Sequence, residues 1–272
     1  MLHERIYIDK SDDRVYIDTY VVNDKSYKRD AILVIPGGGY RSVCTEREGE
    51  PVALAYVAHG MNAFVLTYRS GRDDDVYPKQ LIDAGRAIIY IKENAEKFGI
   101  DPERVFTAGF SAGGHLSGAC AIMYSDPEVK AALGISGDEN KPRAAILGYP
   151  VVTANTPITH QASFKYLLRK AFADMTEEER RRYSLETAVN ENSCPMFIWH
   201  TAEDTVVPFN GSLLLAQAAK DAGVNVTLHV YPYGPHSIAL ATKITAADLN
   251  DRIQPLAEKW LSDSVDWINS LR

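Results

Sequence analysis

The chain has 272 residues, 46% of them hydrophobic, and a formal net charge of -7 at pH 7. This length is sufficient for a sizeable core in one large domain or two small ones. No run approaches the roughly 18 apolar residues of a membrane span, and an acidic chain without a basic run is a poor partner for nucleic acid. We therefore expect neither a membrane nor a nucleic-acid partner.

The N-terminal segment MLHERIYIDK lacks the continuous apolar run of a secretory signal. We interpret it as the start of the fold and expect a cytoplasmic protein. Cys44, Cys120 and Cys194 are odd in number and widely spaced, without a CxxC pair, which indicates neither a disulfide framework nor a zinc site. We expect reduced thiols and no bound metal.

Short apolar strands alternate with helical patterns along the chain. Pro51 and Gly60 bracket one helix, and in a second helix apolar residues recur at helical spacing from Leu81 to Phe98. This alternation predicts an α/β fold with a mostly parallel sheet of about eight strands and helices on both faces. Strands are predicted at 14–22, 31–36, 62–68, 104–109, 144–150, 196–201 and 226–232, and further helices at 213–222 and 256–271.

The segment 151–192 interrupts this alternation. It shows no strand pattern, and it contains the apolar stretch SFKYLLRKAF. Thr176 precedes Glu179 by three residues, the spacing of a capping box at the start of a helix. We therefore expect a single domain, residues 1–272, with a small helical cap inserted at about 151–192.

The pentapeptide GFSAG, residues 109–113, has the G-x-S-x-G spacing of a serine on a sharp strand-to-helix turn. Side chains at Gly109 or Gly113 would collide with the neighbouring strand and helix across such a turn. The motif follows an apolar strand and precedes a helical pattern, which is the context that supports it. Ser111 is thus the predicted nucleophile, and the backbone N–H of Ala112 points toward an oxyanion.

A nucleophilic serine needs a base and an acid that orients the base, here in the chain order Ser, Asp or Glu, His. Asp204 follows the strand 196–201, His236 follows the strand 226–232, and Glu203 is the alternative acid. His236 combines strand, loop and chain order. The other histidines are assigned to packing, to a helix end or to the cap, where His160 would approach the site if the cap is a lid; they are His3, His59, His115, His160, His200 and His229.

The segment VIPGGGY places Gly37, Gly38 and Gly39 directly after an apolar strand. Glycines there leave backbone N–H groups unobstructed, as an oxyanion hole requires. A nucleotide loop is a minor alternative, because neither G-x-G-x-x-G nor G-K-[ST] is present. A plain hairpin turn is the other alternative.

Several separated blocks agree in order and spacing with one known family. VIPGGGY, EGEPVALAYVAHGMNAFVLTYR, YPKQLIDAGRAIIYI, GIDPERVFTAGFSAGGHLSG, WHTAEDTVVP with NGSLLLAQAAKDAG, and HVYPYGPHS resemble the α/β-hydrolase esterases of the acetyl xylan esterase-like and carbohydrate acetylesterase-like type. The resemblance runs from about residue 31 to residue 236. It implies an α/β-hydrolase fold and a serine esterase acting on short acyl esters.

The resemblance also assigns roles to residues. It implies Ser111 as the nucleophile with Asp204 and His236 as its partners, and Gly38, Gly39 and Ala112 as oxyanion donors. The chain departs from the family at two positions. Pro36 stands where related esterases often have histidine, so the outer hydrogen bond of the oxyanion hole must be made differently, and Ser237 stands where glycine often follows the histidine.

The expected reaction is acyl transfer through an acyl-enzyme, without metal or organic cofactor, on a small-molecule ester such as an acetylated sugar or xylo-oligosaccharide. Tyr40, Phe164 and Tyr166 are predicted to shape the acyl or alcohol pocket. The alternatives are a peptidase or amide hydrolase on the same fold, and a non-enzymatic binding protein. A homodimer would use an apolar edge strand or the last helix around Trp260 and Trp267, although packing against the sheet explains both tryptophans more simply.

Overall fold

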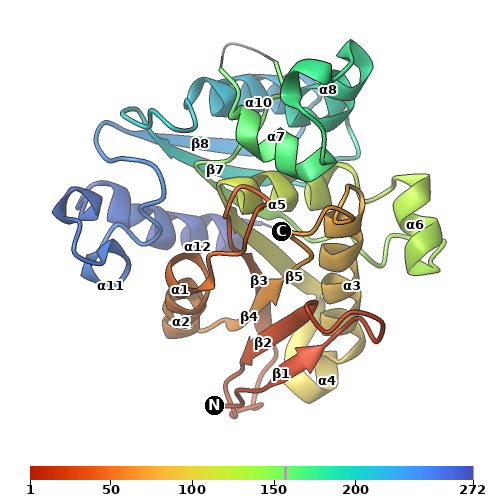
Figure 1. Ribbon diagram of the computed structural model, residues 1–272. Coiled ribbons are helices and arrows are strands. Elements are labelled where there is room, and N and C mark those ends of the chain that lie inside the picture. Colours follow the sequence, from red (N-terminus) through yellow and green to blue (C-terminus); the bar gives the residue numbers. More distant parts are fainter. Residues whose placement is uncertain (156–157, 272) are drawn as a thin grey trace.

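The computed structural model of the chain describes residues 1–155 and 158–271 (Figure 1). Its sheet has eight strands: β1 (Arg5–Tyr7), β2 (Tyr16–Tyr20), β3 (Arg29–Ile35), β4 (Asn62–Thr67), β5 (Ile100–Phe110), β6 (Ala145–Gly148), β7 (Met196–Thr201) and β8 (Val226–Tyr231). The α-helices of the described residues are α1 (Thr45–Glu48), α2 (Glu50–Ala58), α3 (Lys79–Glu93), α4 (Ala95–Phe98), α5 (Ala112–Ile122), α6 (Pro127–Leu133), α7 (Gln161–Leu168), α8 (Glu177–Tyr183), α9 (Leu185–Ala188), α10 (Asn210–Asp221), α11 (Lys243–Ala246) and α12 (Trp260–Ser270). Short 3-10 turns are η1 (Phe172–Asp174), η2 (Asn250–Arg252) and η3 (Ala257–Lys259).

The strand order in the sheet is β1-β2-β4-β3-β5-β6-β7-β8. The strands β1 and β2 pair antiparallel with their neighbours, and every pair from β4 to β8 is parallel. The predicted α/β-hydrolase fold with a mostly parallel sheet is confirmed. Because parallel strands end at the same edge of a sheet, the loops after β3, β5, β7 and β8 meet there.

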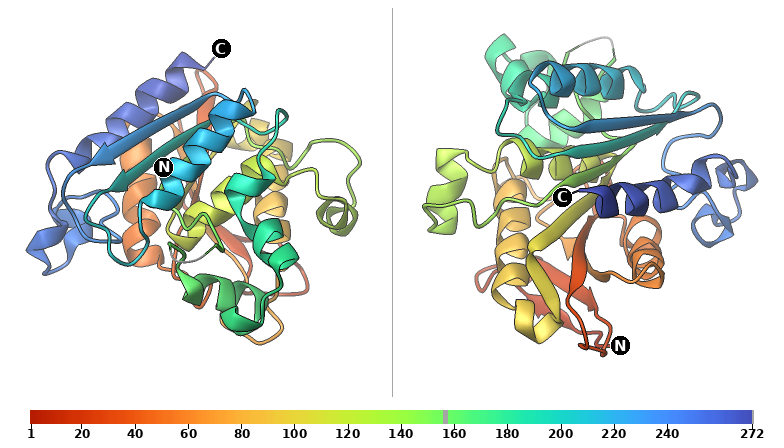
Figure 2. Two further views of the ribbon diagram at one scale, coloured as in Figure 1. Left: turned by 90° about the horizontal axis from the view of Figure 1, so that it is seen from above. Right: turned by 180° about the vertical axis from the view of Figure 1, so that it is seen from behind.

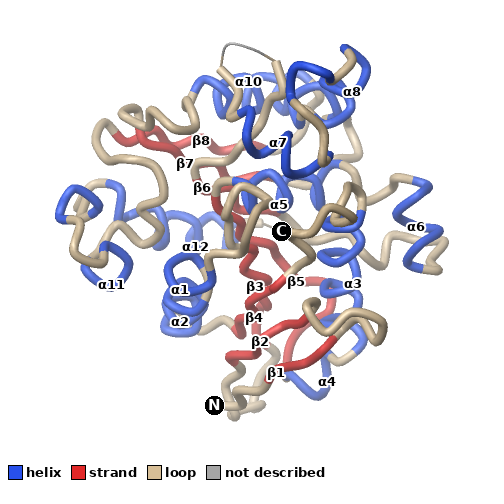
Figure 3. The backbone as a smooth tube through the Cα atoms, in the orientation of Figure 1, coloured by secondary structure: helices blue, strands red, loops and turns tan. Residues whose placement is uncertain are grey.

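Each central strand is buried on both faces, as its unbroken apolar run predicts. In β3, Leu33 packs in one hydrophobic cluster with residues of α3, α5 and α10, and its neighbours Ile32 and Val34 pack in a second cluster with residues of α2 and α12. Figures 2 and 3 show these helices on the two sides of the strands. The helix α12 buries Trp260 and Trp267 against the sheet, so neither is available for a dimer interface.

Some element bounds differ from the sequence prediction. The helix predicted to run through Phe98 ends at Glu93, because Asn94 turns the chain and its side-chain amide donates to the carbonyl of Tyr90. The strand β5 begins at Ile100 rather than near residue 104, since Ile100 pairs with Arg29 of β3.

The segment between β6 and β7 contains the helices α7, α8 and α9, and its described residues form no strand. The capping box at α8 is confirmed: Thr176 Oγ1 accepts from the N–H of Glu179, whose carboxylate accepts from the N–H of Thr176. Figures 1 and 2 show α7 and α8 near α10. Among all the helices of the described ranges, none combines the length and the apolar character that crossing a bilayer requires.

Candidate active site

Ser111 lies at the turn between β5 and α5, and its backbone has φ 54° and ψ -120°. Residues other than glycine rarely adopt this backbone conformation, so the turn is sharp and strained. A Cβ at Gly109 would lie 2.0 Å from the carbonyl oxygen of Gly113, and a Cβ at Gly113 would lie 2.1 Å from that of Ile35. The close approach of strand and helix therefore requires both glycines, for the steric reason that the motif predicts.

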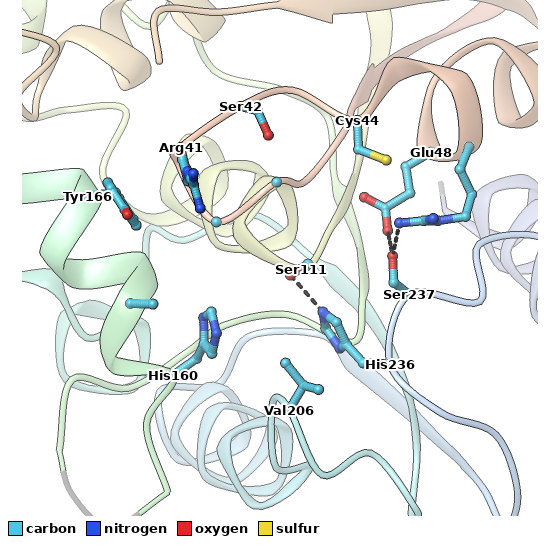
Figure 4. A pocket seen from close by; sticks show the side chains of 14 residues that line it. Arg41, Ser42, Cys44, Glu48, Ser111, His160, Tyr166, Val206, His236 and Ser237 are labelled. Carbon is cyan, nitrogen blue, oxygen red and sulfur yellow. Dashed lines mark hydrogen bonds between the residues drawn. The ribbon is translucent and has the colours of Figure 1, made fainter. Parts of the chain in front are cut away.

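Ser111, His236 and Asp204 form a continuous chain of hydrogen bonds, part of which is drawn in Figure 4. His236 Nδ1 lies 2.6 Å from Asp204 Oδ2, and His236 Nε2 lies 2.9 Å from Ser111 Oγ. A carboxylate only accepts, so Nδ1 carries the proton and Nε2 accepts from the serine hydroxyl. The loops after β5, β7 and β8 bring these three residues together.

Asp204 is buried among four donors. Its Oδ1 accepts from the N–H groups of Val206 and Val207, both at 2.9 Å, and its Oδ2 accepts from His236 and, at 3.2 Å, from His200 Nε2. Burial by itself raises the pKa of this carboxyl, but the hydrogen bonds from His200 and His236 outweigh burial and hold the pKa well below its usual range. Asp204 is therefore ionised at neutral pH.

The remaining candidates for acid and base lie elsewhere. Glu203 is exposed, and its carboxylate accepts from the N–H of Gly234 rather than facing His236. His200 is fully buried, as expected, and its contact with Asp204 was not predicted because nothing in a strand pattern indicates it. His229 is not a core residue: β8 is an edge strand, which leaves its side chain 34% exposed.

Gly38 and Gly39 line a cavity together with Ser111 and His236. Their φ angles of 129° and 64° lie in the region that favours glycine. In the ranges that the structure describes, no hydrogen bond uses the backbone N–H of Gly38, Gly39 or Ala112. Ala112 opens α5, where backbone N–H groups have no partner within the helix. These groups are free to donate to a ligand.

Other hydrogen bonds hold the glycine loop in place of the histidine that related esterases often have at the position of Pro36. The N–H of Gly37 donates to Glu48 Oε2 over 2.8 Å, and the hydroxyl of Tyr68 donates to the carbonyl oxygen of Pro36 over 2.9 Å. Glu48 is only 1% exposed. No sequence signal pointed to it, because it stands at the end of the four-residue helix α1, which is too short for a periodic pattern.

The cavity beside Ser111 has a volume of about 450 Å³. Tyr166 of α7 lines it, whereas Tyr40 and Phe164 do not. Figure 4 shows Tyr166, His160 and Arg41 facing the cavity from the side opposite Glu48. Its walls are Gly38, Gly39, Arg41, Ser42, Cys44, Arg47, Glu48, Ser111, His160, Ala162, Tyr166, Val206, His236 and Ser237.

Tyr40 and Phe164 pack behind the cavity wall, against His115. The hydroxyl of Tyr40 donates to His115 Nδ1 over 2.8 Å, and His115 Nε2 donates to the carbonyl of Tyr183 over 2.8 Å. The ring of Phe164 stands edge-on to His115. Both Tyr40 and Phe164 are buried, so the predicted substrate contact is replaced by a role in joining the glycine loop, α5 and the cap.

His160 brings a second imidazole to the cavity, as the lid interpretation anticipated. Its Nδ1 lies 2.8 Å from Ser163 Oγ. Burial, together with the nearby His236, lowers the pKa of His160. The ring is therefore neutral at pH 7, and its Nε2 has no hydrogen-bond partner among the described residues.

No metal site accompanies these groups within residues 1–155 and 158–271: no cluster of three or more His, Cys, Asp or Glu side chains there could hold an ion.

The chain matches a known family and has close structural relatives. The model of the family described as BD-FAE matches residues 17–219. The chain belongs to the BD-FAE family. Over 98% of its length, this BD-FAE chain is similar to an acetyl ester-xyloside bifunctional hydrolase from Caldicellulosiruptor lactoaceticus, with 29% identity, a TM-score of 0.81 and 96% of that chain covered.

Two curated relatives are longer proteins. Endo-1,4-beta-xylanase B of Butyrivibrio fibrisolvens is 40% identical over 229 residues, which are 82% of this chain and 34% of the relative. Acetylxylan esterase of Xylanibacter ruminicola is 28% identical over 89% of this chain and 45% of the relative. The chain thus spans a third to a half of these proteins. Together, the relatives support a carboxylic ester hydrolase on the α/β-hydrolase fold.

Proposed function

We propose that the chain hydrolyses acetyl and other short acyl esters of small sugars, such as xylo-oligosaccharides, with Ser111 as its nucleophile. One observation carries the proposal. The hydrogen-bonded chain of Asp204, His236 and Ser111 ends in a cavity beside backbone N–H groups that have no partner in the described part of the chain. This is the combination that acyl transfer through a serine requires.

The reaction begins when Ser111 Oγ attacks the ester carbonyl carbon and its proton moves to His236 Nε2. Asp204 holds the protonated imidazole by its Nδ1 hydrogen bond and offsets its charge. The tetrahedral intermediate then collapses: the bond to the alcohol oxygen breaks, and His236 returns the proton to that oxygen. The product of this half-reaction is an acylated Ser111 and free alcohol.

Water completes the cycle. His236 takes a proton from a water molecule, whose oxygen attacks the acyl carbonyl, and the proton passes to Ser111 Oγ as the acid leaves. In both steps the N–H groups of Gly38, Gly39 and Ala112 donate to the oxyanion. Each donor of this kind contributes about a hundredfold or more to the rate.

The cavity and the relatives support a polar alcohol. Arg41 and Tyr166 offer hydrogen-bond donors on one side of Ser111, and His160 adds a ring nitrogen, which together suit a hydroxyl-rich substrate. A cavity of about 450 Å³ accommodates a small ester rather than a long acyl chain. Two of the relatives are named for acetylxylan or acetyl ester and xyloside substrates.

Hydrolysis of p-nitrophenyl acetate, butyrate and octanoate by the wild type and by Ser111→Ala tests the proposal, with acetylated xylo-oligosaccharides and an aminoacyl amide run alongside. We expect acetate to be preferred, the sugar to be deacetylated, and Ser111→Ala to lose at least about a thousandfold in kcat. An unchanged mutant would exclude Ser111 as the nucleophile. Faster turnover of the amide would favour a peptidase, and an inactive, folded wild type would favour a binding protein.

We also propose a cytoplasmic location for the chain. Cys44, Cys120 and Cys194 are free thiols, and thiols are kept reduced in the cytosol. Fractionation of the source cells tests the location: recovery of the protein from the medium would contradict it.

A further inference from the structure

Glu48 joins the two loops that flank the reacting atoms. Its Oε2 accepts from the N–H of Gly37, in the loop after β3, and its Oε1 accepts from Ser237 Oγ over 2.5 Å, in the loop after β8. Ser237 directly follows His236. A single buried carboxylate thus contacts the residue before Gly38 and the residue after the catalytic base.

Tyr149 makes a third hydrogen bond to the carboxylate of Glu48. The hydroxyl of Tyr149, which follows β6, donates to Glu48 Oε1 over 2.9 Å and accepts from the N–H of Ala239 over 3.0 Å. The ring of Tyr149 also stands edge-on to the ring of His236, with centroids 5.1 Å apart. Tyr149 therefore ties Glu48 to a second point of the histidine loop and supports the imidazole itself.

The directions of these bonds are mutually consistent. Glu48 and Ser237 face each other in the cavity wall (Figure 4). The guanidinium of Arg47 donates to Ser237 Oγ over 2.7 Å, so the Ser237 hydroxyl is left to donate to Glu48. The three hydrogen-bond partners of the carboxylate, Gly37, Tyr149 and Ser237, all donate to it, and a carboxylate only accepts. Glutamine cannot replace it without loss, because its amide would place N–H atoms against one of the donors.

The backbone around the carboxylate is strained and needs such anchoring. Tyr149, Ser237 and Ala239 have φ angles of 37°, 65° and 48°, which cost free energy in residues other than glycine. Gly37 admits the carboxylate only because it lacks a side chain: a Cβ there would lie 2.8 Å from Glu48 Oε2. Such conformations persist where the surrounding contacts over-determine them.

We propose that Glu48 is a positioning residue, which holds the Gly38–Gly39 loop and the His236 loop at the separation that acyl transfer requires. The proposal rests on the proposed esterase function. The proposal accounts for Pro36 and Ser237, the two positions at which the chain departs from related esterases. Glu48 anchors the loop that follows Pro36 and accepts a hydrogen bond from the hydroxyl of Ser237. Glu48 itself need not touch the substrate.

Kinetics of Glu48→Gln on p-nitrophenyl acetate, with a trifluoromethyl ketone as a mimic of the tetrahedral intermediate, test this role. We expect kcat to fall about ten- to a hundredfold with little change in KM, because displaced loops lose transition-state contacts rather than substrate binding. The inhibition constant of the ketone should rise by about the same factor as kcat/KM falls. A loss of fold alone would not produce this parallel.

Asp83→Asn is the matched control. Asp83 of α3 is another buried carboxylate outside the cavity, and it accepts from the N–H and the guanidinium of Arg69, which follows β4. We expect this variant to lower the free energy of unfolding while kcat per folded molecule stays at the wild-type level. An equal loss of kcat in Asp83→Asn and Glu48→Gln would reduce Glu48 to a structural residue.

Ser237→Gly provides a second test that keeps the loop folded, because glycine tolerates the φ of this position. We expect Ser237→Gly to lose about fivefold in kcat, the equivalent of one hydrogen bond. In the double variant Glu48→Gln/Ser237→Gly, the fold loss of kcat should be smaller than the product of the fold losses of the two single variants. An active wild type with fully active Glu48→Gln and Ser237→Gly would overturn the role of Glu48 alone. An inactive wild type would overturn the esterase function and this role together.

Discussion

At the scale of single residues, the site depends on side chains whose protonation the fold fixes. His115 is the clearest case away from the reacting atoms. It is fully buried between the hydroxyl of Tyr40 and the carbonyl of Tyr183, an arrangement in which a neutral ring donates from Nε2 and accepts at Nδ1. Protonation of Nδ1 would turn an acceptor into a donor facing Tyr40.

His115 therefore predicts a pH dependence of stability. Burial lowers the pKa of His115 to about 4, so between about pH 6.5 and 4 the unfolded chain binds a proton that the folded chain does not. Stability is then lost as the pH falls through this window, by up to about 3 kcal/mol. Urea unfolding of wild type and His115→Gln from pH 7.5 to 4 measures it. If the free energy of unfolding depended on pH equally in the two proteins, the assignment to His115 would be contradicted.

Residue types and chain order were sufficient to predict Ser111, Asp204 and His236 as neighbours, because loops after parallel strands meet at one edge of the sheet. Glu48 and the contact of His200 with Asp204 could not be predicted. Both depend on the packing of side chains from separate elements. Tyr40 was singled out for its place beside the glycines, but sequence position does not tell which way a ring points, and it points into the core.

At the scale of elements, the turn from β5 to α5 determines where the serine stands. The strand and the helix approach so closely that Gly109 has no room for a methyl group. Here sequence reasoning succeeded, because a motif of small residues carries its own steric explanation. Short helices such as α1 and α6 escaped prediction, since one or two turns show no period.

The steric account predicts opposite results for two glycine substitutions. Gly109→Ala should lower the free energy of unfolding by at least about 2 kcal/mol, because the new Cβ meets backbone rather than a movable side chain. Gly137→Ala should stay within about 0.5 kcal/mol of wild type, since Gly137 is exposed and its nearest neighbours are the flexible carboxylate oxygens of Glu139. Denaturant titration compares them. A well-tolerated Gly109→Ala would refute the steric reason for the motif.

At the scale of the whole molecule, residues 125 positions apart in the sequence form one hydrogen bond, Ser111 to His236. The sheet makes this possible: its parallel strands deliver the glycine loop, the serine turn, the acid and the base to a common edge. The segment between β6 and β7 contributes His160 and Tyr166 to the wall of the cavity. In the proposed reaction the alcohol would lie against these side chains, whose positions the spacing of motifs cannot predict.

The most direct test of the central claim is to identify the residue that a fluorophosphonate modifies. The reagent reacts with a serine that a neighbouring imidazole activates, so peptide mapping by mass spectrometry reads the nucleophile itself. The account predicts one adduct, on Ser111, formed with the wild type and absent from a folded His236→Ala variant. An adduct on another residue, or equal labelling of Ser111 without His236, would contradict it.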